Sequence, residues 1–430
     1  MSENTLILKG NIIFSKNPDQ FTEYPNGYLV VQDGKIIDCF SSLPEAFQKM
    51  PLIDYQNCLI IPGLVDLHLH APQYPICGIN MDLELIPWLN QYAFVEESKY
   101  IESSYFTKAY TKFVSDLRKS ATTRAVIFAT IHTEATKYLM DELEKSGLSA
   151  MVGKVNMDRN SPETLTEDTA DSLEKTERWI LDTKNRYQNV SPIITPRFVP
   201  SCSGQLMRGL GELAEKYHLP VQSHLSENQS EIEWVQELHP DSSCYGDVYH
   251  EYGLFGNPSK TVMAHCVHCP DIELKLMKEN DVYIAHCPQS NINIRSGIAP
   301  IHRYLESGIP IGLGSDLAGG AVMSMFRAVT DAIQVSKLRW TMTTRDFSPV
   351  TITQSFYMAT KGGGSFFGKV GSFEKGYEMD ALILDDSSTG FSKNLTTAQR
   401  LERIMYLGDD RNIVQKFVGG KPLFPESRLK

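Results

Sequence analysis

The sequence predicts an α/β protein, a (β/α)8 TIM-like barrel with a small β-sandwich domain formed by both chain ends. In the long middle part, apolar and β-branched runs alternate with segments of helical period, as in parallel sheets with crossover helices. Each end of the chain is rich in strand-forming residues instead. A length of 430 residues also suits one large barrel with a minor domain.

The apolar runs of the middle part are the predicted barrel strands. They lie near residues 59–69, 125–132, 150–157, 192–199, 220–225, 261–266, 282–287 and 309–315. Segments with helical period lie between most of them, at 104–119, 170–186, 204–217, 228–238 and 271–280. A doubly wound open sheet is the alternative, but no Gly-x-Gly-x-x-Gly turn follows an early strand. The predicted barrel domain comprises residues 64–368.

The two chain ends are predicted to build the small domain together. Residues 5–14 and 28–40 are short strand-like runs, and Asp33-Gly34 inside the second run predicts a hairpin. Near the other end, residues 380–384 have the composition of a strand. A separate appendage on each side of the barrel is the alternative. The predicted small β domain comprises residues 1–63 and 369–430.

Composition narrows the class of protein. The net charge of -11 argues against a nucleic acid or an anionic membrane as partner, because either needs a basic face. No stretch of about 18 uncharged apolar residues is available to span a membrane. The 8 cysteines are scattered, several within apolar runs, which suits reduced thiols. Without a secretion signal at the N-terminus, these features predict a cytoplasmic protein.

The first predicted barrel strand ends in His68-Leu69-His70. Side chains two apart point to the same face of a strand, so His68 and His70 lie together. Two such imidazoles can bind one divalent metal, with nitrogens at roughly 2.0–2.1 Å from zinc. The alternative is a pair of ordinary polar residues where a strand leaves the core. The metal hypothesis depends on further ligands at the ends of later strands.

Most of the predicted strands do end in such residues. Catalytic groups of a (β/α)8 barrel gather where the strands end, on its C-terminal face. Imidazole, guanidinium and carboxylate groups are seldom buried without a partner, so packing alone does not explain them there. The strand-end residues are His68, His70, His132, Arg197, His224, Glu227, His265, His286 and Asp316. Together they predict one functional site.

Several of these motifs resemble the amidohydrolase superfamily. The set is Pro62-Gly-Leu-Val-Asp-Leu-His-Leu-His70, His224-Leu-Ser-Glu227, Ala264-His265 and Gly314-Ser-Asp316. Within the superfamily the chain is similar, nearly end to end, to the guanine deaminases. His-x-His is general to the superfamily, whereas Arg197-Phe198 with His224-x-x-Glu227 is much more specific. The resemblance implies a homodimeric enzyme of purine catabolism.

The resemblance implies one Zn2+ bound by His68, His70, His224 and Asp316. Three imidazoles and a carboxylate leave a position for water, and zinc lowers the pKa of that water to about 7. His265 and Asp316 are then expected to orient the attacking hydroxide, although His265 can instead be a direct ligand. Relatives with two metal ions carry a lysine at the end of strand four, which this sequence lacks at residues 195–198.

Glu227 is the implied proton shuttle. It protonates a ring nitrogen of the substrate and helps carry a proton to the departing ammonia. The alternative for Glu227 is a carboxylate at a helix N-terminus, where the helix dipole favours it.

The implied substrate is guanine, which loses the amino group at C2 and leaves as xanthine. Arg197 has only donors and suits the C6 oxygen, while the amide of Gln73 can donate and accept. Phe198 and Trp88 offer faces for a flat ring. The alternatives are a surface ion pair for Arg197 and plain packing for the two aromatic residues.

Two other functions are alternatives to guanine deamination. The first is a related deaminase of one metal ion that acts on cytosine, 8-oxoguanine or an aminotriazine. The second is a non-catalytic scaffold, which such a full set of ligands disfavours. Arg124 also departs from the family pattern, in what the sequence predicts to be a turn before strand two, and Cys266-x-x-Cys269 is expected to hold thiols.

Overall fold

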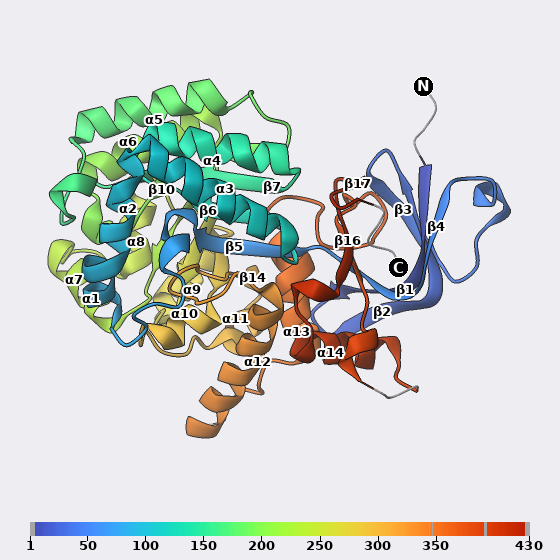
Figure 1. Ribbon diagram of the computed structural model, residues 1–430. Coiled ribbons are helices and arrows are strands. Elements are labelled where there is room, and N and C mark those ends of the chain that lie inside the picture. The colour runs from blue at the N-terminus through green and yellow to red at the C-terminus, as the bar shows by residue number, and fades with distance from the viewer. Residues whose placement is uncertain (1–4, 344, 346, 391–393, 426–430) are drawn as a thin grey trace.

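Parallel strands form the centre of the larger part of the molecule (Figure 1). The computed structural model describes residues 5–343, 345, 347–390 and 394–425. One four-stranded sheet contains β5 (Leu64–His70), β6 (Thr122–Phe128), β7 (Ser149–Gly153) and β9 (Val190–Pro192). The other contains β11 (Val221–Leu225), β12 (Thr261–His265), β13 (Tyr283–His286) and β14 (Ile311–Leu313). Two short strands, β8 (Val155–Asn156) and β10 (Thr195–Pro196), pair with each other.

Hydrogen bonds connect the two four-stranded sheets at both of their edges. At one edge the Gln222 amide donates to the Ile194 carbonyl oxygen at 2.9 Å. At the other edge the Asp316 amide donates to the His68 carbonyl oxygen, and the His70 amide to that of Leu317, each at 2.8 Å. The ends of β5, β11 and the chain after β14 therefore lie close to one another.

Helices follow most of these strands and lie outside them (Figure 1). The predicted helices are present as α3 (Ser103–Lys119), α5 (Thr169–Thr183), α6 (Gly204–Tyr217), α7 (Gln229–Leu238) and α9 (Asp271–Glu279). Helix α3 buries Phe106, Tyr110, Phe113 and Leu117, three or four residues apart, against the strands. Two further long helices, which the predicted segments do not include, are α4 (Thr133–Ser146) and α12 (Met325–Met342). The shorter helices are α1 (Leu85–Trp88), α2 (Phe94–Glu97), α8 (Tyr245–Glu251), α10 (Pro288–Asn293), α11 (Ile301–Glu306), α13 (Ile352–Tyr357) and α14 (Thr397–Leu407).

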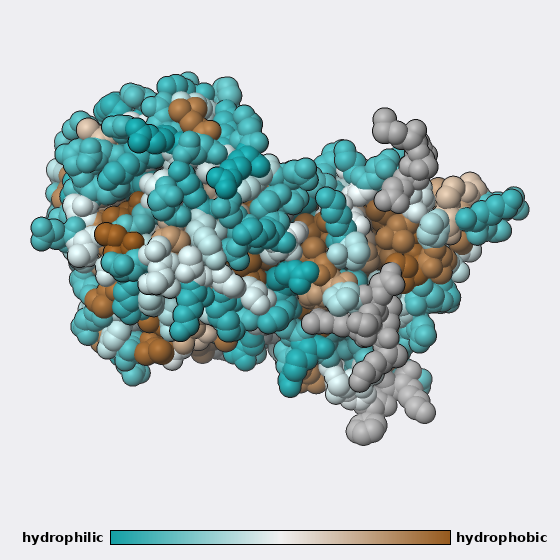
Figure 2. Space-filling model, turned by 45° about the horizontal axis from the view of Figure 1, so that its top comes forward, coloured by the Kyte–Doolittle hydropathy of each residue, from teal (hydrophilic) through white to brown (hydrophobic). Residues whose placement is uncertain are grey.

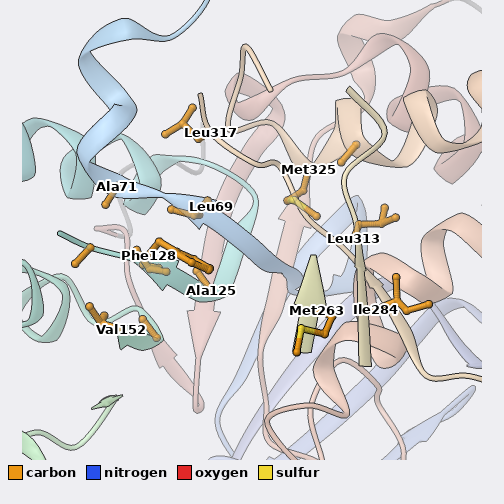
Figure 3. Close-up of a cluster of buried hydrophobic side chains, with 14 of the residues drawn as sticks. Leu69, Ala71, Ala125, Phe128, Val152, Met263, Ile284, Leu313, Leu317 and Met325 are labelled. Carbon is orange, nitrogen blue, oxygen red and sulfur yellow. The ribbon is translucent and has the colours of Figure 1, made fainter. Parts of the chain in front are cut away.

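Apolar side chains from both sheets share one core (Figure 3). Leu69 and Phe128 come from the first sheet, and Met263, Ile284 and Leu313 from the second, all fully buried. Burial of such a side chain contributes about 1.5–3 kcal/mol to folding. This core sits behind the strand ends and holds them in fixed positions.

Both ends of the chain contribute strands to a seven-stranded sheet in the order β17-β16-β15-β4-β1-β2-β3. Its strands are β1 (Thr5–Asn17), β2 (Gln20–Gln32), β3 (Lys35–Phe40), β4 (Leu52–Pro62), β15 (Ala381–Leu384), β16 (Ile413–Val418) and β17 (Lys421–Pro422). The hairpin at Asp33-Gly34 is confirmed, because Gln32 pairs with Lys35. Separate appendages are thus excluded for the described residues, while the sandwich arrangement and the domain limits stay predictions.

Two local predictions were wrong. Residues 59–69 are not one strand, because β4 ends at Pro62 and β5 begins at Leu64. A Cβ atom on Gly63, between them, would lie 2.2 Å from Oγ1 of Thr123, so the chain crosses between sheets at a residue without a side chain. Arg124 lies within β6 rather than in a turn, and its buried guanidinium bonds with Asp380, next to β15.

The surface in Figure 2 is mostly hydrophilic over the helical part, with a larger apolar area at the end of the molecule that holds the seven-stranded sheet. Among the described helices, none has the length and apolar character needed to cross a membrane.

Candidate active site

Five side chains from four strand ends converge at one place. His68 and His70 come from β5, His224 from β11 and His265 from β12, and Asp316 follows β14. Nε2 of His70 lies 3.1 Å from Nε2 of His224. Oδ1 of Asp316 lies 3.1 Å from Nε2 of His68 and 3.6 Å from Nε2 of His70. The alternation along β5 therefore places both imidazoles on one face, as predicted.

The electrostatics of the cluster suit a cation. Burial lowers the pKa of His68, His70 and His224, and neighbouring imidazoles lower it further. The pKa values of His70 and His224 fall far below the usual value. Burial alone would raise the pKa of Asp316, but the adjacent imidazoles outweigh it and hold that pKa well below its usual value. Neutral imidazoles and an ionised carboxylate are the protonation states that bind metal.

Polar atoms in the cluster lack partners within the protein. Among the described residues, no group forms a hydrogen bond with the buried Nδ1 of His70, and Nε2 of His68 has only the carboxylate of Asp316 beside it. The ring atoms of His68, His70 and His224 are close enough to one another to share one ion. A buried polar atom without a partner costs free energy, so this donor set fits a divalent cation.

Neighbouring oxygen atoms orient two of the rings. Nδ1 of His224 lies 2.6 Å from the carbonyl oxygen of Arg197. Nδ1 of His265 lies 2.9 Å from Oδ1 of Asn291. With Nδ1 donating in each ring, Nε2 is free of its proton and faces the cluster. Sequence reasoning assigned no role to Asn291.

The backbone at these strand ends is strained. His265 has a φ of 74° and Cys266 of 50°, while Ser226 has 46° and Asp316 44°. Residues with a side chain in this left-handed region cost about 1–3 kcal/mol each, and such residues gather at functional sites. Backbone strain therefore lowers the stability of the fold at the place where the polar side chains meet.

Glu227 lies beside the cluster, with Oε2 3.3 Å from Nε2 of His265. Its Oε1 accepts a hydrogen bond from Oγ of Ser296 at 3.1 Å. Burial and the charge of Asp316 raise the pKa of Glu227 well above its usual value, so this carboxyl can hold a proton near neutral pH. Helix α7 is capped instead by Asn228 and Glu231. Glu227 is therefore not the capping carboxylate of that helix.

A buried ion pair lies at the other side of the site. Nη1 of Arg197 is 2.5 Å from Oε2 of Glu97, and both side chains are at most 2% exposed. Oε1 of Glu97 accepts from Nε2 of Gln73 at 2.8 Å, and Oε1 of Gln73 accepts from the Ala318 amide at 3.1 Å. The guanidinium also lies 4.8 Å from the ring centre of Phe94. The alternative of a surface ion pair for Arg197 is thus wrong only in its location, because the ion pair is buried. The sequence analysis assigned no role to its partner, Glu97.

A small cavity of about 30 Å³ joins these groups. It is lined by His70, Gln73, Leu85, Trp88, Leu89, Arg197, Phe198, His224, Glu227, Glu231, His265, Ile294 and Asp316. The predicted substrate-binding residues Gln73, Arg197, Phe198 and Trp88 are all among them. Of the described strand-end residues, His68, His132 and His286 do not line it. Burial lowers the pKa of His286 to about 3, so it packs as a neutral ring.

Comparisons with known proteins agree with this geometry. Residues 59–423 match the model of the Amidohydrolase family. The chain is 35% identical to the guanine deaminase of Dictyostelium discoideum over 98% of this chain and 99% of the relative. It is 40% identical to that of Mus musculus over 85% and 83%. A crystal structure of guanine deaminase from C. acetobutylicum with guanine bound in the active site superposes with a TM-score of 0.96, at 51% identity, covering 98% of this chain and 100% of that one.

Proposed function

We propose a function for this chain on the basis that it belongs to the amidohydrolase family and, within it, to the guanine deaminases. The proposed function is the hydrolytic deamination of guanine to xanthine and ammonia, a step of purine catabolism. The observation that carries it is the convergence of three neutral imidazoles and an ionised Asp316 at one point, beside the cavity that Glu227 lines.

The metal we propose is one Zn2+ held by His68, His70, His224 and Asp316. The short distances between the Nε2 atoms of His70 and His224, and from Asp316 to His68 and His70, support this set. When bound, the ion supplies a water molecule acidified to a pKa of about 7. His265 lies 3.9 Å from Oδ2 of Asp316, and together these two side chains orient the attacking water. The chain has no lysine at residues 195–198, which supports one ion over two.

Glu227 is proposed to move the protons. Its raised pKa lets it enter the reaction protonated and give that proton to a ring nitrogen next to C2. The carbon then becomes more electrophilic, a C–O bond forms at C2, and the C–N bond to the amino group breaks. Glu227 next takes the proton released by the attacking water and passes it to the amino group, which leaves as ammonia. As the C2 oxygen becomes a carbonyl, its remaining proton goes to Glu227 and restores the protonated carboxyl. Ser296 holds the other carboxyl oxygen in place.

The base is proposed to lie between aromatic faces and polar donors. Phe198 and Trp88 line the cavity and suit the two faces of a purine. The N–H groups of Arg197 that do not donate to Glu97 suit the C6 oxygen of the base. Gln73 has one further N–H that does not donate to Glu97 and can contact the same oxygen.

We further propose a closed (β/α)8 barrel over residues 64–368, with a small β-sandwich domain from residues 1–63 and 369–430. The hydrogen bonds at both edges of the four-stranded sheets and the shared sheet of the chain ends support this division. Family membership supports a homodimer in the cytoplasm.

The direct test incubates zinc-loaded protein with guanine and follows xanthine by absorbance and ammonia by a coupled assay. Cytosine, 8-oxoguanine and an aminotriazine are supplied in parallel at equal concentration. We expect guanine to have the highest kcat/KM of the four. A higher value for another base would replace guanine as the substrate, and no ammonia from any base would favour a scaffold.

A further inference from the structure

We infer that Glu97 is a positioning residue that sets the specificity of the pocket for the C6 oxygen of the base, acting through Arg197 and Gln73. The inference rests on the proposed function, since it concerns how the same cavity distinguishes its ligands. Glu97 does not line the cavity, whereas both of its partners do. Its effect on a ligand is therefore indirect.

Each oxygen of Glu97 receives one donor. Oε2 lies 2.5 Å from Nη1 of Arg197, and Oε1 lies 2.8 Å from Nε2 of Gln73. The Ala318 amide donates to Oε1 of Gln73, so the two ends of the Gln73 amide have opposite partners and only one orientation satisfies both. The carboxylate thus fixes two side chains that share one wall of the cavity.

Only a carboxylate satisfies this arrangement. Arg197 and Gln73 donate to different oxygens of Glu97, and a glutamine at position 97 replaces one of these oxygens by an NH₂ group, so one of the two donors then faces another donor. Either the guanidinium loses its acceptor, or the Gln73 amide turns and sets its own NH₂ group against the Ala318 amide. Each outcome moves a donor of the cavity wall away from its present place.

Burial makes the charge of Glu97 matter. Its side chain is 1% exposed and that of Arg197 2%, so water does not replace a lost partner. The Phe94 ring lies under the guanidinium, 4.8 Å from its carbon to the ring centre, and restricts where the group can turn. Phe94 and Glu97 both belong to α2, which follows the segment that supplies Leu85, Trp88 and Leu89 to the cavity. One segment therefore carries both the apolar wall and the carboxylate.

The neighbouring residue provides a matched control. Glu96 is also in α2 and is 2% exposed. Its carboxylate bonds to Lys99 at 2.6 Å and to the hydroxyl of Tyr105, and it touches neither Arg197 nor Gln73. Glu96→Gln therefore makes the same chemical change in the same helix without reaching the cavity wall.

The test measures binding of two bases that lack the amino group at C2 and cannot lose it. Hypoxanthine keeps the C6 oxygen of guanine, and purine lacks it. Their dissociation constants are measured by calorimetry on the zinc-loaded protein, and the ratio of purine to hypoxanthine reports the contribution of that oxygen. We expect Glu97→Gln to lower this ratio by about tenfold or more, the range for a hydrogen bond to a charged group. Glu96→Gln is expected to leave the ratio within twofold of the unmodified protein.

A general loosening of the pocket would weaken both bases equally and leave the ratio unchanged, which would overturn the inference. A ratio near one in the unmodified protein would overturn it as well. If Glu97→Gln does not fold, Glu97→Asp is measured in its place, because it keeps the charge but has a shorter side chain. A purine to hypoxanthine ratio unchanged in Glu97→Asp would also overturn the inference. Guanine turnover of the unmodified protein is measured separately, so loss of the proposed function is seen independently of the binding ratio.

Discussion

Nε2 of His70 and Nε2 of His224 lie 3.1 Å apart, although 154 residues separate them in the chain. Two nitrogens bound to one zinc ion at about 2.0–2.1 Å, at a near-tetrahedral angle, lie roughly 3.3 Å from each other. The fold therefore brings the two rings to the separation that a shared ion requires. Burial keeps both rings neutral, so at most one of these two nitrogens carries a proton.

Replacement of His70 tests the metal set. We expect His70→Ala to weaken zinc binding by more than about a hundredfold, since loss of a residue that only supports a ligand already costs 10–100-fold. Zinc content after dialysis against a competing chelator is measured by elemental analysis. His132→Ala changes another strand-end imidazole that does not line the cavity, and it should keep its zinc. Equal zinc content in both variants would contradict the proposed ligands.

Glu227→Gln tests the proton shuttle. The amide keeps the shape and can still accept from Ser296, but it cannot give or take a proton at the ring nitrogen. We expect kcat for guanine to fall by about 10²–10⁴-fold while zinc content and thermal stability stay near those of the unmodified protein. Glu237→Gln, on the exposed side of α7, is the control and should retain full turnover. Undiminished kcat in Glu227→Gln would remove the residue from the reaction.

Much of the barrel could be predicted because its strands are buried on both faces and appear as continuous apolar runs. The candidate site residues followed from the rule that catalytic groups of a barrel lie at the strand ends, and the resemblance to the guanine deaminases singled out four of them as ligands. The break at Gly63 could not be predicted in this way, because the last residues of β4 and the first residues of β5 are all apolar and buried. Only the contact with Thr123 in the folded protein shows why the residue between them has no side chain.

The role of Glu97 could not be predicted from the sequence, because the local hydropathy pattern indicates an exposed residue at this position. Val95 is 53% exposed, whereas Glu97, two residues later, is buried. A hydropathy pattern would place the valine inside and the carboxylate in water. The burial of Glu97 depends on Arg197, which is distant in sequence and neutralises its charge. Asn291 and Ser296 were missed for a similar reason, because their partners come from other strands.

Arg124 is expected to hold the barrel and the seven-stranded sheet together. Its Nε lies 2.6 Å from Oδ2 of Asp380, which is fully buried, and its Nη2 lies 2.5 Å from Glu378. Arg124→Met leaves the carboxylate of Asp380 without its cation, so we expect the free energy of unfolding to fall by about 3–5 kcal/mol. Urea denaturation measures it. Arg411→Met, which removes an exposed ion pair with Asp409, should change it by less than about 0.5 kcal/mol. A fully stable Arg124→Met protein would show that this ion pair does not join the two parts.

Lys416 makes the stability of the fold depend on pH. Burial lowers the pKa of this amine to about 7 from 10.5, against the opposing attraction of Asp410 and with a further lowering by Arg118. Its Nζ donates to the carbonyl oxygen of Thr122 at 2.7 Å. Between these two pKa values the unfolded chain binds the proton and the folded chain does not, so stability must rise with pH.

From pH 7 to pH 9 this one group should add about 2 kcal/mol to the free energy of unfolding. Lys416→Met has no such group, so its stability should rise by that much less over the same interval. Chemical denaturation at pH 7, 8 and 9 measures both proteins, and Lys421→Met, which changes an exposed lysine, should follow the unmodified protein. Equal slopes for Lys416→Met and the unmodified protein would mean that the buried amine keeps its proton throughout. Its carbonyl partners and Asp410 would then stabilise the charge more than burial opposes it.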